Sequence, residues 1–382
     1  MGKPELRFPE FTEEWEEVIL KDVLKRVSIP VDVDKETSYK QIGIRSHGKG
    51  LFYKESVTGK ELGNKRVFWI EPDCLVLNIV FAWERAVART TQNEVGLIAS
   101  HRFPMYKTAD NKLDLDYAVQ YLTTKKGSNI LILASPGGAG RNKTLGQDAF
   151  LKSRMLLPNI AEQKKIVELL QAINDVITIE QNQVLLWEEK KKCVMQMIFS
   201  QEIKFKADNG SDYPEWEYKI IRDCLQYEQP TKYLVSSEDY NANFKTPVLT
   251  ANKGFILGYT NEEEGIYDKG NAIIYDDFTM DTKYVTFKFK VKSSAIKILT
   301  SKDDIDLYYV FSYIQSLNLH QAEHARSYIS KVESMDIPVP CADEQLKITE
   351  CLSTIDNVIN MKHQKVDVWE NIRNGLLQQM FI

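Results

Sequence analysis

The feature that most constrains this chain is an internal repeat. Residues 158–200 align without a gap on residues 340–382, and 15 of the 43 aligned positions are identical. The front ends repeat as well, since Trp15-Glu16 recurs as Trp216-Glu217. Self-similarity of this kind has to be recognised before a fold is assigned, because each copy is one structural unit. The chain is therefore predicted to be a tandem of two units, each a globular body followed by a long helix.

The repeated tails carry an apolar stripe with a seven-residue period, which predicts helices that pair as a coiled coil. Each helix would have roughly 38 residues and a length of about 57 Å. We expect the two helices to pack antiparallel, because that arrangement buries both stripes within one chain. The two bodies would then be carried to opposite ends and related by an approximate two-fold axis. The expected seam consists of Ile166, Ile173, Val184 and Trp187 in the first copy and Ile348, Ile355, Val366 and Trp369 in the second.

The bodies are predicted to be mixed α+β domains. Runs of β-branched and aromatic residues, punctuated by Gly, Asn and Asp, indicate short strands. These runs lie at 67–83, 129–135, 246–259, 271–278 and 283–290. One helical segment is expected in both copies, after Asp114 and after Asp306. The predicted organisation is a first body at 1–157, a helix at 158–200, a linker at 201–213, a second body at 214–339 and a helix at 340–382.

Composition sets few limits on function. A net charge of −5 and a pI of about 5.7 do not announce a nucleic-acid-binding protein, but a DNA-reading face is a local property that total charge can hide. The five cysteines are scattered and odd in number, which is typical of reduced thiols. The sequence contains neither an apolar run near the length of a membrane span nor a signal-peptide pattern at its start, so a cytoplasmic location is expected.

The order of elements closely resembles the specificity subunit (HsdS) of type I restriction–modification enzymes, over essentially the whole chain. The resemblance is carried by Leu157-Pro158 with EQKKI at 162–166, by Val339-Pro340 with EQLKI at 344–348, and by the entry segments PEFTEEWEEVILKDV and YPEWEYKIIRDC. It implies that each body is a target recognition domain reading one half of a bipartite, gapped double-stranded DNA target, and that the paired helices set the gap. It also implies a non-catalytic chain without a cofactor or metal, which docks two methyltransferase (modification) subunits and, in the full complex, restriction and translocase subunits.

Basic and polar side chains neutralise phosphates and read base edges. The candidates for DNA binding are Arg45, Ser46, His47, Lys49, Arg85, Arg89, His101, Arg102, Arg141, Asn142 and Lys143 in the first body, and Lys253, Lys283, Tyr284, His324, Arg326, Ser327 and Tyr328 in the second. Any one of these clusters could instead be solvated surface. The loops before the long helices, 136–144 and 324–328, are favoured because both divergent bodies keep basic and polar residues there.

Two motifs in the sequence suggest catalytic alternatives. The segment 136–144 follows a predicted strand and resembles a phosphate-binding loop, but Asn142 stands where that motif needs Gly. His320, Glu323 and His324 match the H-x-x-E-H pattern of zinc peptidases, yet no third ligand is identifiable. Methylase, helicase and nuclease motifs are not found in the sequence. The remaining alternative from another class is a two-headed coiled-coil scaffold that binds proteins through its bodies.

Overall fold

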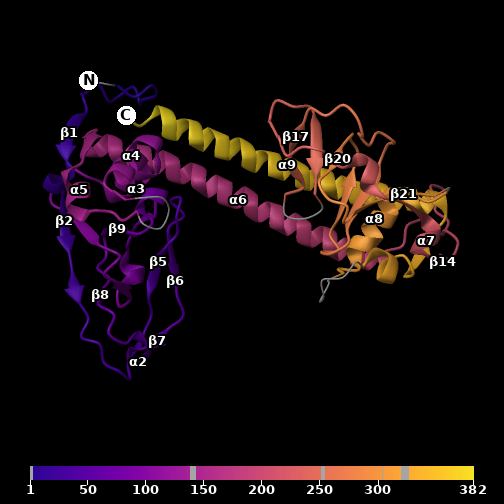
Figure 1. The fold of residues 1–382 in the computed structure, drawn as a ribbon, viewed down its shortest axis with the longest axis horizontal. Coiled ribbons are helices and arrows are strands. Elements are labelled where there is room, and N and C mark those ends of the chain that lie inside the picture. Colours follow the sequence, from indigo (N-terminus) through magenta and orange to yellow (C-terminus); the bar gives the residue numbers. More distant parts are fainter. Residues whose placement is uncertain (1–2, 138–142, 251–253, 303, 320–326) are drawn as a thin grey trace. The chain divides into compact units, whose positions relative to one another are not determined.

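The computed structural model describes residues 3–137, 143–250, 254–302, 304–319 and 327–382, and Figure 1 shows its ribbon. The chain divides into two compact units. Unit 1 contains Met1–Glu180 and Lys365–Ile382, and unit 2 contains Gln181–Gln364. The two long helices, α6 (Ile160–Phe199) and α9 (Ala342–Gln379), each contribute residues to both units.

Unit 1 is built on a four-stranded antiparallel sheet and a smaller three-stranded one. The first has the order β10 (Val87–Arg89), β9 (Leu75–Leu77), β12 (Met105–Thr108), β2 (Leu24–Val27). The second has the order β11 (Ile98–Ser100), β8 (Val67–Trp69), β3 (Ile29–Pro30). Three two-stranded pairings complete the body: β1 (Glu16–Ile19) with β13 (Arg154–Leu157), β4 (Ser38–Tyr39) with β7 (Val57–Thr58), and β5 (Ile42–Ile44) with β6 (Leu51–Tyr53).

Unit 2 repeats the four-stranded sheet of unit 1, but its three-stranded sheet is arranged differently because it contains a parallel pair. Its four-stranded sheet has the order β15 (Leu225–Glu228), β21 (Ile296–Ser301), β18 (Ala272–Asp276), β19 (Thr282–Val285). Its three-stranded sheet has the order β17 (Ile256–Thr260), β16 (Thr246–Leu249), β20 (Lys290–Val291), and β14 (Glu217–Ile220) pairs with β22 (Asp336–Val339). The registers also correspond, because Leu24 faces Thr108 in unit 1 as Leu225 faces Ser301 in unit 2. The repeat that the sequence shows in the tails therefore extends into the four-stranded sheet of each body.

The helical segment expected in both bodies is confirmed. It is α3 (Leu115–Thr123) in unit 1 and α8 (Leu307–Ser316) in unit 2. Asp114 and Asp306 are their N-caps, each accepting a hydrogen bond from the backbone N–H three residues on, at 2.9 and 2.7 Å. The shorter helical elements are α1 (Leu20–Val23), α2 (Gly59–Leu62), α4 (Lys125–Leu133), α5 (Gln147–Lys152), α7 (Ile221–Cys224), η1 (Ala82–Glu84), η2 (Gln92–Glu94), η4 (Pro230–Tyr233) and the π-helical turn η5 (Tyr328–Val332).

The strand predicted over residues 129–135 is wrong, because this run belongs to helix α4 and the turn that ends it. Thr124 caps the helix by accepting a hydrogen bond from the N–H of Gly127 at 3.1 Å. A Cβ at Gly127 would lie 2.0 Å from the carbonyl oxygen of Tyr121, so glycine allows α4 to pack against the end of α3. The loop 136–144 consequently follows a helix rather than a strand, which removes the context that a phosphate-binding loop requires.

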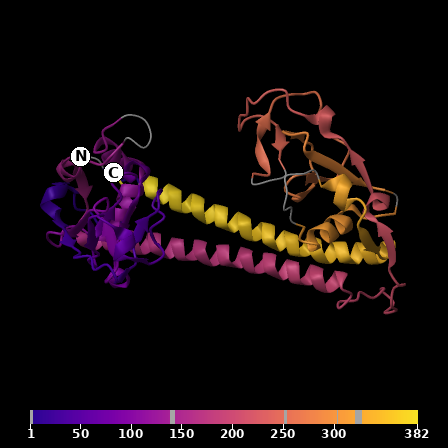
Figure 2. The same cartoon turned by 60° about the horizontal axis from the view of Figure 1, so that its bottom comes forward.

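Helices α6 and α9 pack antiparallel, as predicted, and they run side by side in Figures 1 and 2. In unit 1, Ile166 near the start of α6 shares a core with Met380 at the end of the chain. In unit 2, Ile198 near the end of α6 shares a core with Ile348 near the start of α9. Of the expected seam residues, Ile166, Ile173, Val184 and Ile348 are buried, whereas Trp187, Ile355, Val366 and Trp369 are half-buried. Within the described part of the chain, no helix is long and apolar enough to cross a membrane.

The repeated Glu-Gln pair has a structural role. The side-chain oxygen of Gln163 accepts a hydrogen bond from the N–H of Asp114 at 2.8 Å, and its nitrogen donates to the carbonyl of Pro158 at 2.9 Å. Gln345 makes the same two contacts, with Asp306 at 2.8 Å and Pro340 at 2.9 Å. Both glutamines are buried. The motif therefore fastens the start of α3 or α8 to the start of the long helix.

Each body is also completed by the end of the other repeat's helix. The ring of Phe381, at the end of the second repeat, lies 5.2 Å from that of Tyr117 and 6.0 Å from that of Tyr121 in unit 1. Phe199, at the end of the first repeat, lies 5.6 Å from Tyr309 and 5.2 Å from Tyr313 in unit 2. The identical Phe at these two repeat positions thus fills equivalent places in the two cores.

Candidate nucleic-acid interface

The basic clusters predicted in the first body meet at the turn between β9 and β10, residues 78–86. The hydroxyl of Ser46 donates to the carboxylate of Glu84 at 2.7 Å, and the N–H of His47 donates to the carbonyl of Glu84 at 2.7 Å. The N–H of Gly48 donates to the carbonyl of Arg85 at 2.9 Å. The loop 44–50 is therefore pinned to the turn 78–86, although about 35 residues separate them in the sequence.

Three residues at this junction have a left-handed backbone conformation. His47 and Arg85 both have a φ of 63°, a conformation that costs non-glycine residues energy and that clusters at functional sites. The guanidinium of Arg85 donates to Nδ1 of His47 at 3.3 Å and to the carbonyl of Thr123 at 3.3 Å. Gly48 has a φ of +67°, and a Cβ there would lie 2.5 Å from Cγ2 of Thr123, so this position needs glycine.

Two further predicted clusters border the same turn. The N–H of Leu145, in the segment that precedes α5 and α6, donates to the carbonyl of Ile79 at 2.8 Å. The N–H of Ile79 donates in turn to the carbonyl of Arg102 at 3.0 Å. The ammonium of Lys143 lies 5.0 Å from the ring centre of Trp83. The structure thus gathers on one turn side chains from four separate segments, of which Arg45, Lys49, His101 and Arg102 are exposed.

Unit 2 has an equivalent turn, between β18 and β19. Asn78 and Asp276 occupy the same register, and each accepts a hydrogen bond from the N–H two residues on, at 3.1 and 2.9 Å. The N–H of Ser327 donates to the carbonyl of Asp277 at 3.1 Å, which matches the contact from Leu145 to Ile79. The segment before each long helix therefore borders the same turn in both bodies, which supports the equivalence inferred from the sequence.

Ser327 and Tyr328 require a correction, because both are buried and so do not fit the predicted contact with DNA. The hydroxyl of Ser327 donates to the carbonyl of Asp277 at 2.8 Å, and the N–H of Tyr328 donates to the Asp277 carboxylate at 3.0 Å. Lys297, which sequence reasoning missed, lies 3.1 Å from the other oxygen of Asp277, and both side chains of this ion pair are buried. These residues anchor the end of the segment that precedes α9.

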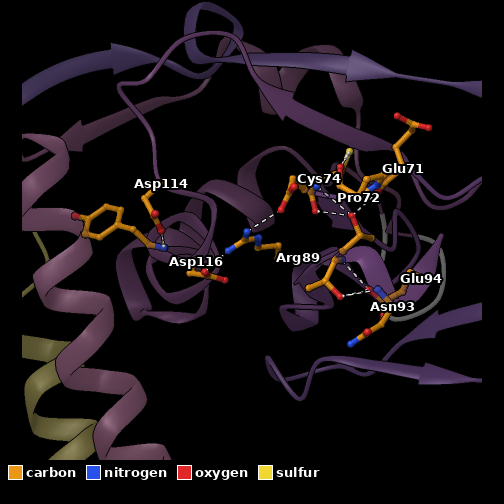
Figure 3. A network of polar contacts seen from close by, with 12 residues as sticks. Glu71, Pro72, Cys74, Arg89, Asn93, Glu94, Asp114 and Asp116 are labelled. Carbon is orange, nitrogen blue, oxygen red and sulfur yellow. Dashed lines mark hydrogen bonds and ion pairs between the residues drawn. The ribbon is translucent and has the colours of Figure 1, made fainter.

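Arg89 also differs from expectation. Its guanidinium is held between two carboxylates, with a hydrogen bond of 2.7 Å to Asp73 and a second ion pair to Asp116. Figure 3 shows Arg89 beside Asp116. The hydrogen bond to Asp73 is the main cause that raises the pKa of Arg89. Because Asp116 belongs to α3 and Arg89 to β10, the pair joins helix to sheet. Arg89, which is partly exposed, is thus already engaged by two carboxylates of its own body.

The remaining candidates in unit 2 lie near the sheet edge. Lys283 is exposed. Tyr284 is half-buried, with its ring 5.1 Å from that of Tyr308 and its hydroxyl accepting a hydrogen bond from Asn271 at 3.1 Å. Arg141, Asn142, Lys253, His324 and Arg326 lie outside the described residues, as do His320 and Glu323 of the zinc-peptidase pattern. Among the residues that are described, no group of three or more His, Cys, Asp or Glu could hold a metal ion.

Comparison with known proteins agrees with this geometry. Residues 213–368 match the Type I restriction modification DNA specificity domain. A segment of 155 residues is 45% identical to the specificity subunit of the type I restriction enzyme EcoR124I/EcoR124II from Escherichia coli, covering 39% of this chain and 38% of that protein. The predicted resemblance to type I specificity subunits is therefore confirmed, by matches that each cover about two fifths of the chain.

Solved structures show the same fold over the whole chain. The S subunit of a type I restriction–modification system from M. genitalium aligns with a TM-score of 0.58 at 12% identity, covering 100% of this chain and 99% of that one. The HsdS subunit from Thermoanaerobacter tengcongensis aligns with a TM-score of 0.50 at 15% identity, covering 98% of both chains. At such low identity the likeness concerns the fold, which is the predicted pair of α+β bodies with two long helices.

Proposed function

We propose that this chain is the non-catalytic DNA sequence-recognition subunit of a type I restriction–modification complex. Each body, at 1–157 and 214–339, reads one half of a bipartite double-stranded DNA target, and the two long helices set the gap between the halves. The observation that carries this proposal is the pair of equivalent turns, 78–86 and 277–281, each bordered by the segment that precedes a long helix. Two similar scaffolds with different side chains at the same place are suited to reading two different sequences.

The first body offers a chemically suitable reading edge. Arg45 and Lys49 are exposed cations on a loop whose backbone is tied down by the Glu84 and Arg85 carbonyls. Cations neutralise phosphates, while Arg and Lys that reach guanine, and Asn or Gln that reach adenine, distinguish bases. A preorganised loop loses less conformational entropy when it binds, so the rigid junction at His47 and Arg85 favours affinity.

The long helices leave apolar side chains in contact with water, which supports the docking of partner subunits on them. These exposed residues are Ile179, Leu185 and Leu186 on α6, and Met361, Val368 and Ile372 on α9. Exposed apolar residues that gather on a surface mark interaction sites. We assign them to contacts with two modification subunits, with restriction subunits joining in the full complex in the cytoplasm.

The test is selection of bound duplexes from a random library by the chain assembled with its modification subunits. We expect a consensus of two short sequences separated by a gap of fixed length. Changing Arg45 and Lys143 to Ala should relax one half-site and leave the other intact. The Lys60→Ala variant, which removes an exposed charge from α2 of the same body, is the control and should keep both half-sites.

Two results would contradict the proposal. Equal loss of discrimination at both half-sites would mean that the bodies do not read independently. The absence of any enriched sequence would favour the alternative, a two-headed scaffold that binds only proteins.

A further inference from the structure

In unit 2, one carboxylate joins the recognition body to both long helices. The hydroxyl of Tyr308, on α8 of the body, donates to a carboxylate oxygen of Asp356 on α9. The ammonium of Lys191, on α6, lies 2.7 Å from the other oxygen of Asp356. The Lys191 and Asp356 side chains are 12% and 30% exposed, so water screens the pair only in part. We call these three residues the Asp356 node.

Aromatic contacts extend the Asp356 node into the sheet of the body. The Lys191 ammonium lies 6.0 Å from the ring centres of both Tyr308 and Phe311. The ring of Tyr284, on β19, lies 5.1 Å from Tyr308 and 5.6 Å from Phe311. An uninterrupted series of contacts therefore runs from β19 through α8 to α6 and α9. Since β19 follows the turn 277–281, the Asp356 node is linked to the edge proposed to face DNA.

The body packs on the helices through an apolar core that includes Tyr308, Ile198 and Ile348, but the interface is hollow on the side of the Asp356 node. A hollow of about 850 Å³ opens beside the Asp356 node, and its lining includes Lys283 of the body, Glu188 of α6 and Asn360 of α9. Close packing resists movement, and the hollow removes packing on this side of the interface. The polar contacts of the Asp356 node therefore add to the apolar core in holding the body at its angle.

The first repeat has different chemistry at the three matching positions, which are Asp116, Asn174 and Arg373. Asp116 replaces the hydroxyl donor Tyr308 with an acceptor, and its carboxylate is engaged by Arg89 of its own sheet. Asn174 carries no charge to hold a cation as Asp356 holds Lys191. The contact from body to helices through this position is therefore a feature of the second repeat.

We propose that the Asp356 node is a positioning device that fixes the angle of the second recognition body against the long helices, and thereby restricts the number of base pairs accepted between the two half-sites. This inference rests on the function proposed above. Changing a gap by one base pair moves a half-site by about 3.4 Å and turns it by roughly 35° around the duplex. A body held by both the apolar core and the Asp356 node resists that turn, whereas a body held by the apolar core alone follows it more readily.

The test measures the affinity of the full chain, assembled with its modification subunits, for the selected target and for targets whose gap is one base pair longer or shorter. The variants are Tyr308→Phe, which keeps the ring and removes the donor, and Lys191→Met, which keeps most of the side-chain volume and removes the charge. The control is Asn174→Ala, at the position in the first repeat that matches Asp356. We expect the affinity ratio between the normal and altered gaps to fall at least about five-fold in both variants and to stay unchanged in the control. Discrimination against base changes within each half-site should persist.

Melting temperature separates a positioning role from a purely structural one. A variant that melts earlier but keeps the wild-type ratio between gaps would overturn the proposal. So would a loss of half-site discrimination equal to the loss of gap discrimination. If the wild-type chain selects no gapped target at all, the proposed function itself fails, and the Asp356 node has no gap to restrict.

Discussion

Replacing Phe381 with Ala should destabilise the first body selectively. Its side chain is 2% exposed and packs between the rings of Tyr117 and Tyr121. Its carbonyl also accepts a hydrogen bond of 3.4 Å from Lys126.

The expected cost follows from burial. Truncating a fully buried Phe to Ala typically lowers the free energy of unfolding by about 3–5 kcal/mol. The matching residue Phe199 is half-buried against Tyr309 and Tyr313, so its truncation should cost roughly half as much. A loss of about 3 kcal/mol corresponds to amide exchange that is roughly 100-fold faster wherever exchange requires global opening of the unit.

Hydrogen exchange read by mass spectrometry on peptides from each sheet is the suitable assay, because it reports the two units separately. Phe381→Ala should accelerate exchange in β9 and β12 and leave β18 and β21 unchanged. The matched variant Phe199→Ala should do the reverse, with the smaller magnitude. Equal acceleration in both sheets, or a cost below about 1 kcal/mol for Phe381→Ala, would refute the claim that each repeat completes the other body's core.

Three further changes give distinct expectations. Burial raises the pKa of Glu344, although the hydrogen bond of 2.8 Å that its carboxylate accepts from Trp216 acts in the opposite direction. The stability that protonated Glu344 contributes to the fold is therefore fully present below the unfolded-state pKa, and it is lost as pH rises through the folded-state pKa. Thermal melting of Glu344→Gln, which keeps an acceptor for Trp216, should therefore match wild type at pH 4 and equal or exceed it at pH 8; a lower value at pH 8 would count against this account. Glu162→Gln, at the matching position, should instead lower the free energy of unfolding by about 2 kcal/mol at pH 7. The reason is that the guanidinium of Arg7, which is only 14% exposed, loses its charged partner. An unchanged free energy of unfolding in a denaturant titration would contradict this. Arg89→Met should lower the stability of unit 1 by about 1 kcal/mol and leave the salt dependence of DNA binding unchanged. If the slope of log binding constant against log salt concentration falls in magnitude by about one, Arg89 contacts a phosphate instead.

The long helices and the tandem organisation were predictable because both signals lie along the chain. A gapless repeat of 43 positions with a seven-residue stripe indicates two equal helices, and one chain offers them no simpler partner than each other. The run at 129–135 was not predictable from its apolar character, since a short apolar run fits a buried strand or a helix equally well. The cap formed by Thr124 and Gly127 is the signal that would have decided the matter.

The site was only partly predictable for a different reason. That His47 and Arg85 belong to one junction depends on how the sheet brings the two loops together, which spacing does not reveal. Arg89 looked like a DNA contact because its partner Asp116 is distant in sequence. Ser327 and Tyr328 looked exposed because the buried pair of Asp277 and Lys297 that anchors them involves two other strands.

The central claim is that the helices set the distance between two independently read half-sites, and shortening both helices tests it most directly. Removing one heptad at residues 180–186 together with the matching heptad at 362–368 should keep the antiparallel seam in register and shorten it by about 10 Å, which is about three base pairs of DNA. Selection of bound duplexes by the shortened chain with its modification subunits should return the wild-type half-sites with a gap about three base pairs shorter. An unchanged gap, or half-sites that differ from those of the wild type, would contradict the account.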